Sequence, residues 1–179
     1  MVKGACIYVE GADREDLRRS AREAFTTLFA PVMGRRKPRF IFCGPRQNAF
    51  AEFEAHLEQR RREPALLLVD AEDVVEEPSR WNHVRKRKED KWERPTRANE
   101  DDLRFMAVVM ESWCIAGSFP HRELERIPKN EVEATLKKTG WTKDGSNSFE
   151  LVRRADLALL CRRSPEFNAL CERLRVLTA

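Results

Sequence analysis

The stretch LLLVDAED, Leu66 to Asp73, decides the fold class of this chain. Its apolar residues run directly into Asp70, and Glu72 and Asp73 follow. A short continuous apolar run is typical of a strand that is buried on both faces, as strands are in parallel sheets. Acidic side chains at the end of a buried strand are costly to desolvate, so we expect a cation or water to lie against them.

Two earlier segments repeat this strand pattern. ACIYVE, residues 5–10, ends in an acid, and RFIFCG, residues 39–44, ends in a glycine. Apolar residues at helical spacing fill residues 14–30 and recur from Ala49 to Leu57. This alternation of strands and helices predicts a parallel sheet that is covered by helices on both faces.

The second half of the chain is expected to add one strand and then helices. LRFMAVVMESWCIAG, residues 103–117, predicts a buried fourth strand that passes into a helix around Met110 or Glu111. Helical patterns recur in three later segments: residues 131–138, 149–161 and 165–177. We therefore expect an α/β fold with a mainly parallel central sheet of about four strands, flanked by helices, and a helical C-terminal part over about residues 130–177.

A single domain is expected over residues 1–179, because the sequence shows neither an internal repeat nor a second apolar core. Within it, residues 76–99 are polar and basic and lack periodicity, which predicts a long surface loop. The sequence has no apolar run of membrane length and no signal-peptide pattern, so we expect a cytoplasmic protein without membrane contact. It leaves open whether the protein forms oligomers.

Composition narrows the functional classes. The net charge of +4 and the isoelectric point near 8.9 permit nucleic-acid binding without requiring it. The five cysteines form no CxxC pair and the three histidines are scattered, so a zinc site is not expected. An odd number of unpaired thiols favours a reducing compartment. The sequence also lacks the GxxxxGK phosphate loop, so the chain is not itself a P-loop ATPase.

Acidic residues end two of the predicted strands. Glu10 closes the first strand, Asp70 closes the third, and Glu72 lies on the same side as Asp70 if the chain stays extended. Ligands of open parallel sheets bind beyond the carboxyl ends of the strands, where these carboxylates would converge. Oxygen ligands of this kind suit Mg²⁺ or Mn²⁺, whereas the same alternation points Asp73 away. Strand-end acids that simply face solvent are the alternative.

The order of these motifs resembles the Toprim (topoisomerase–primase) fold, in which a glutamate closes the first strand and an Asp-x-Asp pair closes the third, together binding Mg²⁺. Here Glu10 and Asp70 match, and Glu72 replaces the second aspartate of the pair with a longer acid. More narrowly, the chain resembles a Toprim-like family of small stand-alone proteins of unknown function, often encoded beside ATPases of the ABC or OLD type in bacterial anti-phage defence loci. The motifs that carry this resemblance, between about Val2 and Asp156, are YVEG, CGPRQNAF, LLLVDAED, MESW at 110–113 and SFEL at 148–151.

The resemblance implies a metal-dependent phosphodiesterase, a nuclease acting on DNA or RNA as the effector subunit of an anti-phage system with an ATPase partner. Glu10, Asp70 and Glu72 would be its metal-binding catalytic residues. The single tyrosine, Tyr8, lies inside the first predicted strand, so hydrolysis is favoured over the covalent chemistry of a topoisomerase. The alternative is a non-catalytic Toprim-like interaction or regulatory subunit bound to an ATPase.

Four further residues are candidates for the same site. Glu111 stands in an apolar run, where a charge is costly unless paired; the resemblance implies a metal ligand or a base, and an arginine partner is the alternative. Arg46 and Asn48 begin a predicted helix, where they would hold a phosphate, anchor the acids or form an ordinary turn. Lys143 would reach the scissile phosphate from its loop, unless it is simply solvated.

A basic cluster, VRKRKEDKWERP at residues 84–95, is the candidate for nucleic-acid contact. Interleaved cations and an aromatic ring suit a nucleic-acid backbone with occasional base stacking. The acids in the same segment dilute its positive charge, so a solvated loop is equally compatible with the pattern. The candidate binding residues are Arg85, Lys86, Arg87, Lys88 and Trp92.

Overall fold

The computed structural model describes residues 4–140 and 146–179, and a four-stranded sheet lies at its centre. All neighbouring strands pair in parallel, in the order β2-β1-β3-β4. The α/β class with a parallel sheet of about four strands is thereby confirmed. The strands are β1 (Cys6–Val9), β2 (Arg39–Phe42), β3 (Ala65–Val69) and β4 (Leu103–Phe105).

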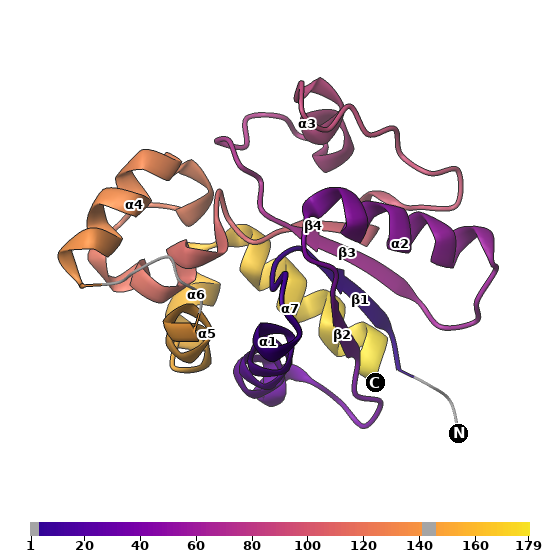
Figure 1. Ribbon diagram of the computed structural model, residues 1–179, viewed down its shortest axis with the longest axis horizontal. Helices are drawn as coiled ribbons and strands as arrows, with labels where there is room; N and C mark the ends of the chain where they lie inside the picture. Colours follow the sequence, from indigo (N-terminus) through magenta and orange to yellow (C-terminus); the bar gives the residue numbers. More distant parts are fainter. Residues whose placement is uncertain (1–3, 141–145) are drawn as a thin grey trace.

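Helices alternate with the strands and then form the C-terminal part, as expected (Figure 1). The α-helices are α1 (Glu15–Phe29), α2 (Arg46–Glu58), α3 (Arg80–Lys86), α4 (Lys129–Lys138), α5 (Ser146–Arg153), α6 (Leu157–Arg163) and α7 (Pro165–Thr178). The 3₁₀ segments are η1 (Ala30–Val32), η2 (Glu100–Asp102), η3 (Met110–Ser118) and η4 (Leu124–Arg126). Within the described residues, no helix combines the length and the apolar character needed to cross a membrane.

The two faces of the sheet are covered by two apolar clusters. Cys6 and Tyr8 of β1 face the cluster that α2 and α3 complete, and Ile7 and Val9 face the cluster that includes α1, η3 and the C-terminal helices. Figure 1 shows α2 and α3 on one side of the sheet and α1 and α7 on the other. Every residue of β3 is buried, as its continuous apolar run predicts.

Aromatic rings join the C-terminal helices to the rest of the fold. Phe25 of α1 is fully buried and contacts Phe42 of β2 at a centroid distance of 5.0 Å. Phe29 stacks on Phe167 of α7 at 5.3 Å, and Trp113 of η3 meets the same ring edge-on at 5.0 Å. Burial of each such side chain contributes about 1.5–3 kcal/mol, so the C-terminal helices share one core with the sheet.

The structure departs from the expectation in two segments. Residues 76–99 are not a plain loop, because they contain α3, which Ser79 caps and which buries Trp81 and Val84. A helix this short carries too few apolar positions to show a period. The single helix expected over residues 149–161 is divided into α5 and α6, and the side chain of Asp156 caps α6 by accepting a hydrogen bond from the Leu159 N–H at 3.0 Å.

Candidate metal centre

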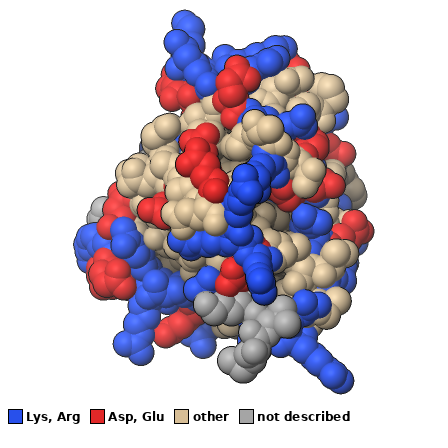
Figure 2. Space-filling model, turned by 90° about the vertical axis from the view of Figure 1, so that its right-hand side faces the viewer, with Lys and Arg blue, Asp and Glu red and all other residues tan. Residues whose placement is uncertain are grey.

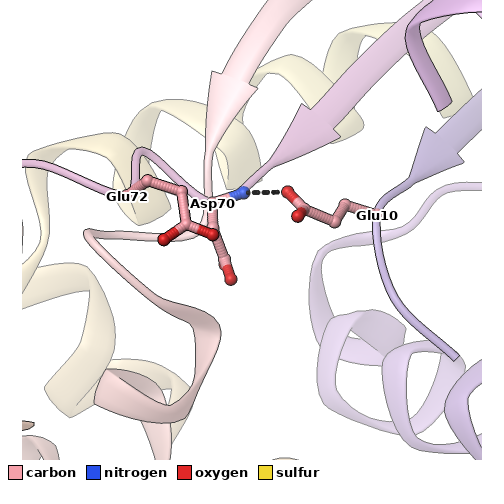
Figure 3. Close-up of side chains that lie close together, drawn as sticks. All are labelled: Glu10, Asp70 and Glu72. Carbon is pink, nitrogen blue, oxygen red and sulfur yellow. Dashed lines mark hydrogen bonds between the residues drawn. The ribbon is translucent and has the colours of Figure 1, made fainter. Parts of the chain in front are cut away.

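Three carboxylates converge at the carboxyl edge of the sheet. Glu10 directly follows β1, Asp70 directly follows β3, and Glu72 lies two residues beyond. Because β1 and β3 are adjacent and parallel, their carboxyl ends meet. One oxygen of each residue lies within 4.8 Å of the others, and Figure 3 shows the three side chains directed toward a common space. We call Glu10, Asp70 and Glu72 the acidic cluster.

Glu72 reaches the acidic cluster by a different route from the one predicted. Its backbone has φ +67, a left-handed conformation, so the strand does not continue in extended form to this residue. Its N–H instead donates to the carbonyl of Val108 at 2.8 Å, in the segment after β4. The turn directs the Glu72 carboxylate to the side of Asp70. Asp73 lies outside the cluster, as expected, and pairs with Arg87.

Two glycines join the chain segments that follow β1 and β2. The N–H of Gly11 donates to the carbonyl of Gly44 at 2.7 Å, and the reverse bond measures 3.0 Å. Both residues have positive φ, at +109 and +75, which glycine adopts without the steric cost that other residues carry. A Cβ on Gly44 would also lie 3.0 Å from the Oδ1 of Asp13. The paired turns therefore hold the chain directly after Glu10 in a fixed position.

Backbone N–H groups orient two of the three carboxylates. The Asp70 N–H donates to Oε2 of Glu10 at 3.0 Å (Figure 3), and the Met110 N–H donates to Oδ1 of Asp70 at 2.8 Å. Glu10 and Asp70 are therefore anchored to the chain segments that follow β3 and β4 rather than free in solvent. Such anchoring gives the acidic cluster a preorganised geometry.

Burial and mutual repulsion disfavour the charged forms of these acids. Burial raises the pKa of the Glu10 carboxyl above its ordinary value, although the charge of Arg46 opposes this rise. Burial also raises the pKa of Asp70, well above its usual value, and the charges of neighbouring glutamates add to the effect. Those glutamates are Glu10, Glu111 and Glu72. A bound cation would reverse both effects, because it stabilises the ionised carboxylates.

Two basic side chains border the acidic cluster. Nη1 of Arg46 lies 3.9 Å from Glu10 Oε2 and 4.0 Å from Glu72 Oε1. The same nitrogen donates to the backbone carbonyl of Asp70 at 3.1 Å. Nζ of Lys129, at the start of α4, lies 2.5 Å from Oε2 of Glu72. The negative charge of the cluster is thus partly balanced by cations of the protein itself.

Arg46 is held in place by residues from the predicted basic loop. Its Nη2 donates to Oδ2 of Asp90 at 2.9 Å, and its Nε lies 2.9 Å from Oδ1 of the same residue. The Asp90 side chain is only 1% exposed. The guanidinium also lies over the ring of Trp92, 5.0 Å from its centroid, as in a cation–π contact. These contacts orient the guanidinium toward the acids.

The acidic cluster is suited to a hard divalent cation. All three side chains offer oxygen atoms, the ligands that Mg²⁺, Mn²⁺ and Ca²⁺ prefer. Oxygens on opposite sides of Mg²⁺ lie about 4.2 Å apart, since each Mg–O distance is about 2.1 Å. The 4.8 Å limit on the separations in the cluster is only slightly wider. Small side-chain rotations would therefore let the acidic cluster hold a metal ion.

The other predicted site residues divide into near and distant groups. Glu111 lies close enough to Asp70 for its charge to raise the Asp70 pKa, but its carboxylate is not part of the acidic cluster. Asn48 is exposed and its amide donates to the carbonyl of Cys43, at 3.4 Å, within its own turn. Lys143 lies outside the described residues. Arg46 is therefore the candidate phosphate ligand that the fold places directly at the acids.

The basic cluster is less open than its sequence suggests. Trp92 is 3% exposed and stacks on Phe50 with ring centroids 4.6 Å apart, so its ring is not available to stack on a base. Arg87 pairs with both Asp73 and Asp90, and Lys86 pairs with Glu77. Arg85 is exposed and lies 4.0 Å from Glu93, and Lys88 is exposed as well. Arg87 therefore fixes the segment against the fold, whereas Arg85, Lys86 and Lys88 stay exposed.

Two residues of the site were not found from the sequence. Lys129 follows Glu72 by 57 positions, and no local pattern connects them. Asp90 appeared in the sequence only as an acid that diluted a basic segment, yet it orients Arg46. A signal for Asp90 existed in principle, because an acid among many arginines in a folded segment usually pairs with one of them.

Comparisons with protein-family models, with curated proteins and with solved structures found no match to this chain. The resemblance to the Toprim-like family therefore remains an expectation from the sequence motifs.

Proposed function

We propose that the protein is a metal-dependent phosphodiesterase of the Toprim type that cleaves DNA or RNA. The observation that carries this proposal is the convergence of three carboxylates, two of them held by backbone N–H groups, at the carboxyl edge of a parallel sheet. Ligand sites of open α/β sheets lie at this edge. An oxygen-only donor set beside an arginine favours a divalent metal ion together with an anionic substrate.

Each residue has a distinct role in this proposal. Glu10, Asp70 and Glu72 hold Mg²⁺ or Mn²⁺, which when bound polarises the phosphodiester and lowers the pKa of the attacking water. Arg46, fixed by Asp90, donates hydrogen bonds to a phosphate oxygen and stabilises the negative charge that develops there. Glu111, which lies near Asp70, accepts the proton of the attacking water.

The proposal extends to partners through the sequence resemblance. The substrate is a nucleic acid, and an ATPase of the ABC or OLD type controls access to the site in an anti-phage system. Exposed basic side chains of the 84–95 segment, among them Arg85 and Lys88, would contact the nucleic-acid backbone.

Metal titration tests the site directly. With Mg²⁺ or Mn²⁺ at about 100 times the dissociation constant, we expect the wild type to gain about 2.7 kcal/mol in its free energy of unfolding. Asp70→Asn should lose both this gain and the cleavage of DNA and RNA oligonucleotides. Asp16→Asn, an exposed aspartate of α1, is the matched control and should keep both. Metal-dependent cleavage that survives both Asp70→Asn and Glu10→Gln would contradict the assignment.

One observation favours a second function, a non-catalytic subunit that binds an ATPase. Lys129 and Arg46 already contact carboxylates of the acidic cluster, so the acids would have a structural role without any metal. This function predicts no stabilisation by Mg²⁺ or Mn²⁺, no cleavage with or without the ATPase, and ATPase binding that Asp70→Asn leaves intact. The metal titration therefore separates the two functions.

A further inference from the structure

A second polar site lies at the opposite edge of the sheet, where the strands begin. A pocket of about 340 Å³ opens beside Ala65, the first residue of β3. Three chain segments line it: the turn after α2, the loop before η2, and α7. We call it the arginine pocket, after Arg60, Arg61, Arg62, Arg97 and Arg173. Figure 2 looks onto this end of the molecule, where Lys and Arg side chains are spread over much of the surface.

The turn that carries three of these arginines is held by hydrogen bonds of a buried histidine. Arg60 has φ +50, which reverses the chain directly after α2. His56 is 2% exposed, and its two ring nitrogens lie 2.9 Å from the Tyr8 hydroxyl and 2.8 Å from the Glu63 carbonyl. The histidine thereby ties the turn to β1. Arg60, Arg61 and Arg62 are presented on a defined backbone rather than on a loose loop.

The positive charge of the arginine pocket is only partly balanced. Arg173 pairs with Asp102 at 3.0 Å, and Arg61 donates to the neutral side chain of Gln59 at 2.9 Å and 2.6 Å. Across residues 4–140 and 146–179, no ion pair involves Arg60, Arg62 or Arg97. The lining thus holds five arginines and two acidic residues, Glu63 and Asp102. Guanidinium groups gathered in this way repel one another unless an anion lies between them.

The lining indicates which kind of anion fits. Guanidinium groups bind phosphate oxygens through paired N–H donors, and several arginines from different segments can contact several phosphates at once. None of the described lining residues is a Phe, Tyr or Trp, and both nitrogens of His56 are occupied, so the pocket has no platform for stacking a base. Its chemistry selects phosphate groups rather than bases.

We propose that the arginine pocket binds a ligand with two or more linked phosphate groups, supplied either by a nucleoside polyphosphate or by a nucleic-acid backbone. This site is independent of the acidic cluster, which lies at the other edge of the sheet. A volume of 340 Å³ is within the range of small-ligand sites. Because the two sites lie at opposite edges of the sheet, this proposal does not depend on the proposed nuclease function.

Calorimetric titration with inorganic tripolyphosphate tests the pocket. The buffer contains EDTA and no divalent ion, so that the acidic cluster does not contribute. We expect saturable binding, weakened about tenfold or more by Arg62→Gln and by Arg97→Gln, because each removes charge-assisted hydrogen bonds. Arg162→Gln, which removes an exposed arginine from α6, is the matched control and should change the dissociation constant by less than about twofold. Circular dichroism checks that each variant is folded.

Two further ligands identify the source of the phosphates. If a short single-stranded oligonucleotide binds, is displaced by tripolyphosphate and is weakened by Arg97→Gln, the ligand is a nucleic-acid backbone. If ATP and tripolyphosphate bind in this way and the oligonucleotide does not, the ligand is a free polyphosphate. The proposal is overturned if tripolyphosphate shows no saturable binding at millimolar concentration, or if Arg162→Gln weakens binding as much as Arg62→Gln does.

Discussion

Glu125 should make the stability of this protein depend on pH. Glu125 belongs to η4, and its carboxyl is buried. Its Oε1 accepts hydrogen bonds from the Ser164 hydroxyl and from the Glu166 N–H at 3.2 Å. Its other oxygen, Oε2, is buried and has no hydrogen-bond partner among the described residues. Burial raises the pKa of Glu125 to about 7, although the hydrogen bond from Ser164 opposes the rise. Between about pH 4.5 and pH 7, the folded protein therefore keeps a proton on Glu125 that the unfolded chain releases.

The size and sign of the effect follow from this shift. The unfolded chain loses the Glu125 proton near pH 4.5 and the folded protein loses it near pH 7. Below pH 4.5 both states are protonated, and the residue carries no penalty. The free energy of unfolding then falls as the pH rises through this window, and above pH 7 the fold carries a buried carboxylate. At about 1.4 kcal/mol per pKa unit, the full loss is on the order of 3 kcal/mol.

Urea unfolding of the wild type and Glu125→Gln across this pH range measures the effect. Glutamine has the shape of the protonated acid and cannot ionise, so we expect the wild type to lose about 3 kcal/mol relative to the variant as the pH rises. Glu123→Gln, an exposed residue beside η4, is the control and should differ from the wild type by a constant amount, within about 0.5 kcal/mol. A difference between wild type and Glu125→Gln that stays constant with pH would refute the argument.

Three further outcomes are expected. Asp90→Asn removes the buried charge that contacts Arg46, so it should lower the free energy of unfolding by about 3–5 kcal/mol in urea titration. A loss below about 1 kcal/mol would show that this ion pair does not stabilise the fold. Lys129→Gln should tighten Mg²⁺ binding about fivefold in calorimetry, because the metal ion no longer competes with an ammonium group for Glu72. Weaker binding would contradict a competition between Lys129 and the metal ion. Gly44→Ala should cost about 1–3 kcal/mol, since φ +75 is strained for alanine, and an unchanged melting temperature would argue against a rigid turn.

The fold was largely predictable because its strands carry a strong signal. β3 is buried along its whole length, and its LLLV run could not be an amphipathic strand. The alternation with helices then left a parallel sheet as the simplest topology. α3 was missed because its buried face has only two apolar residues, Trp81 and Val84, beside His83, and the charges around them dominate the composition. Short helices that depend on tertiary packing leave little periodicity in a sequence.

The candidate site was predictable only in part. The strand-end rule placed Glu10 and Asp70 correctly, since parallel pairing alone brings their positions together. The prediction that Glu72 lies on the same side as Asp70 was correct, but its reason was wrong. A left-handed turn rather than an extended strand directs the Glu72 side chain. Lys129 depends on how α4 packs beyond the sheet edge, and no spacing rule describes that packing.

The length of β3 sets the approximate separation between the two ends of the sheet. Five residues at about 3.3 Å each place the acidic cluster roughly 16 Å from the arginine pocket. A stacked nucleic-acid strand rises about 3.4 Å per nucleotide, so about five stacked nucleotides span this length. Dinucleotides and trinucleotides in a stacked conformation are too short to bridge them. The affinity of the unaltered chain for oligonucleotides can therefore be measured as their length increases. A step in affinity near five nucleotides would indicate that one strand occupies the acidic cluster and the arginine pocket at the same time.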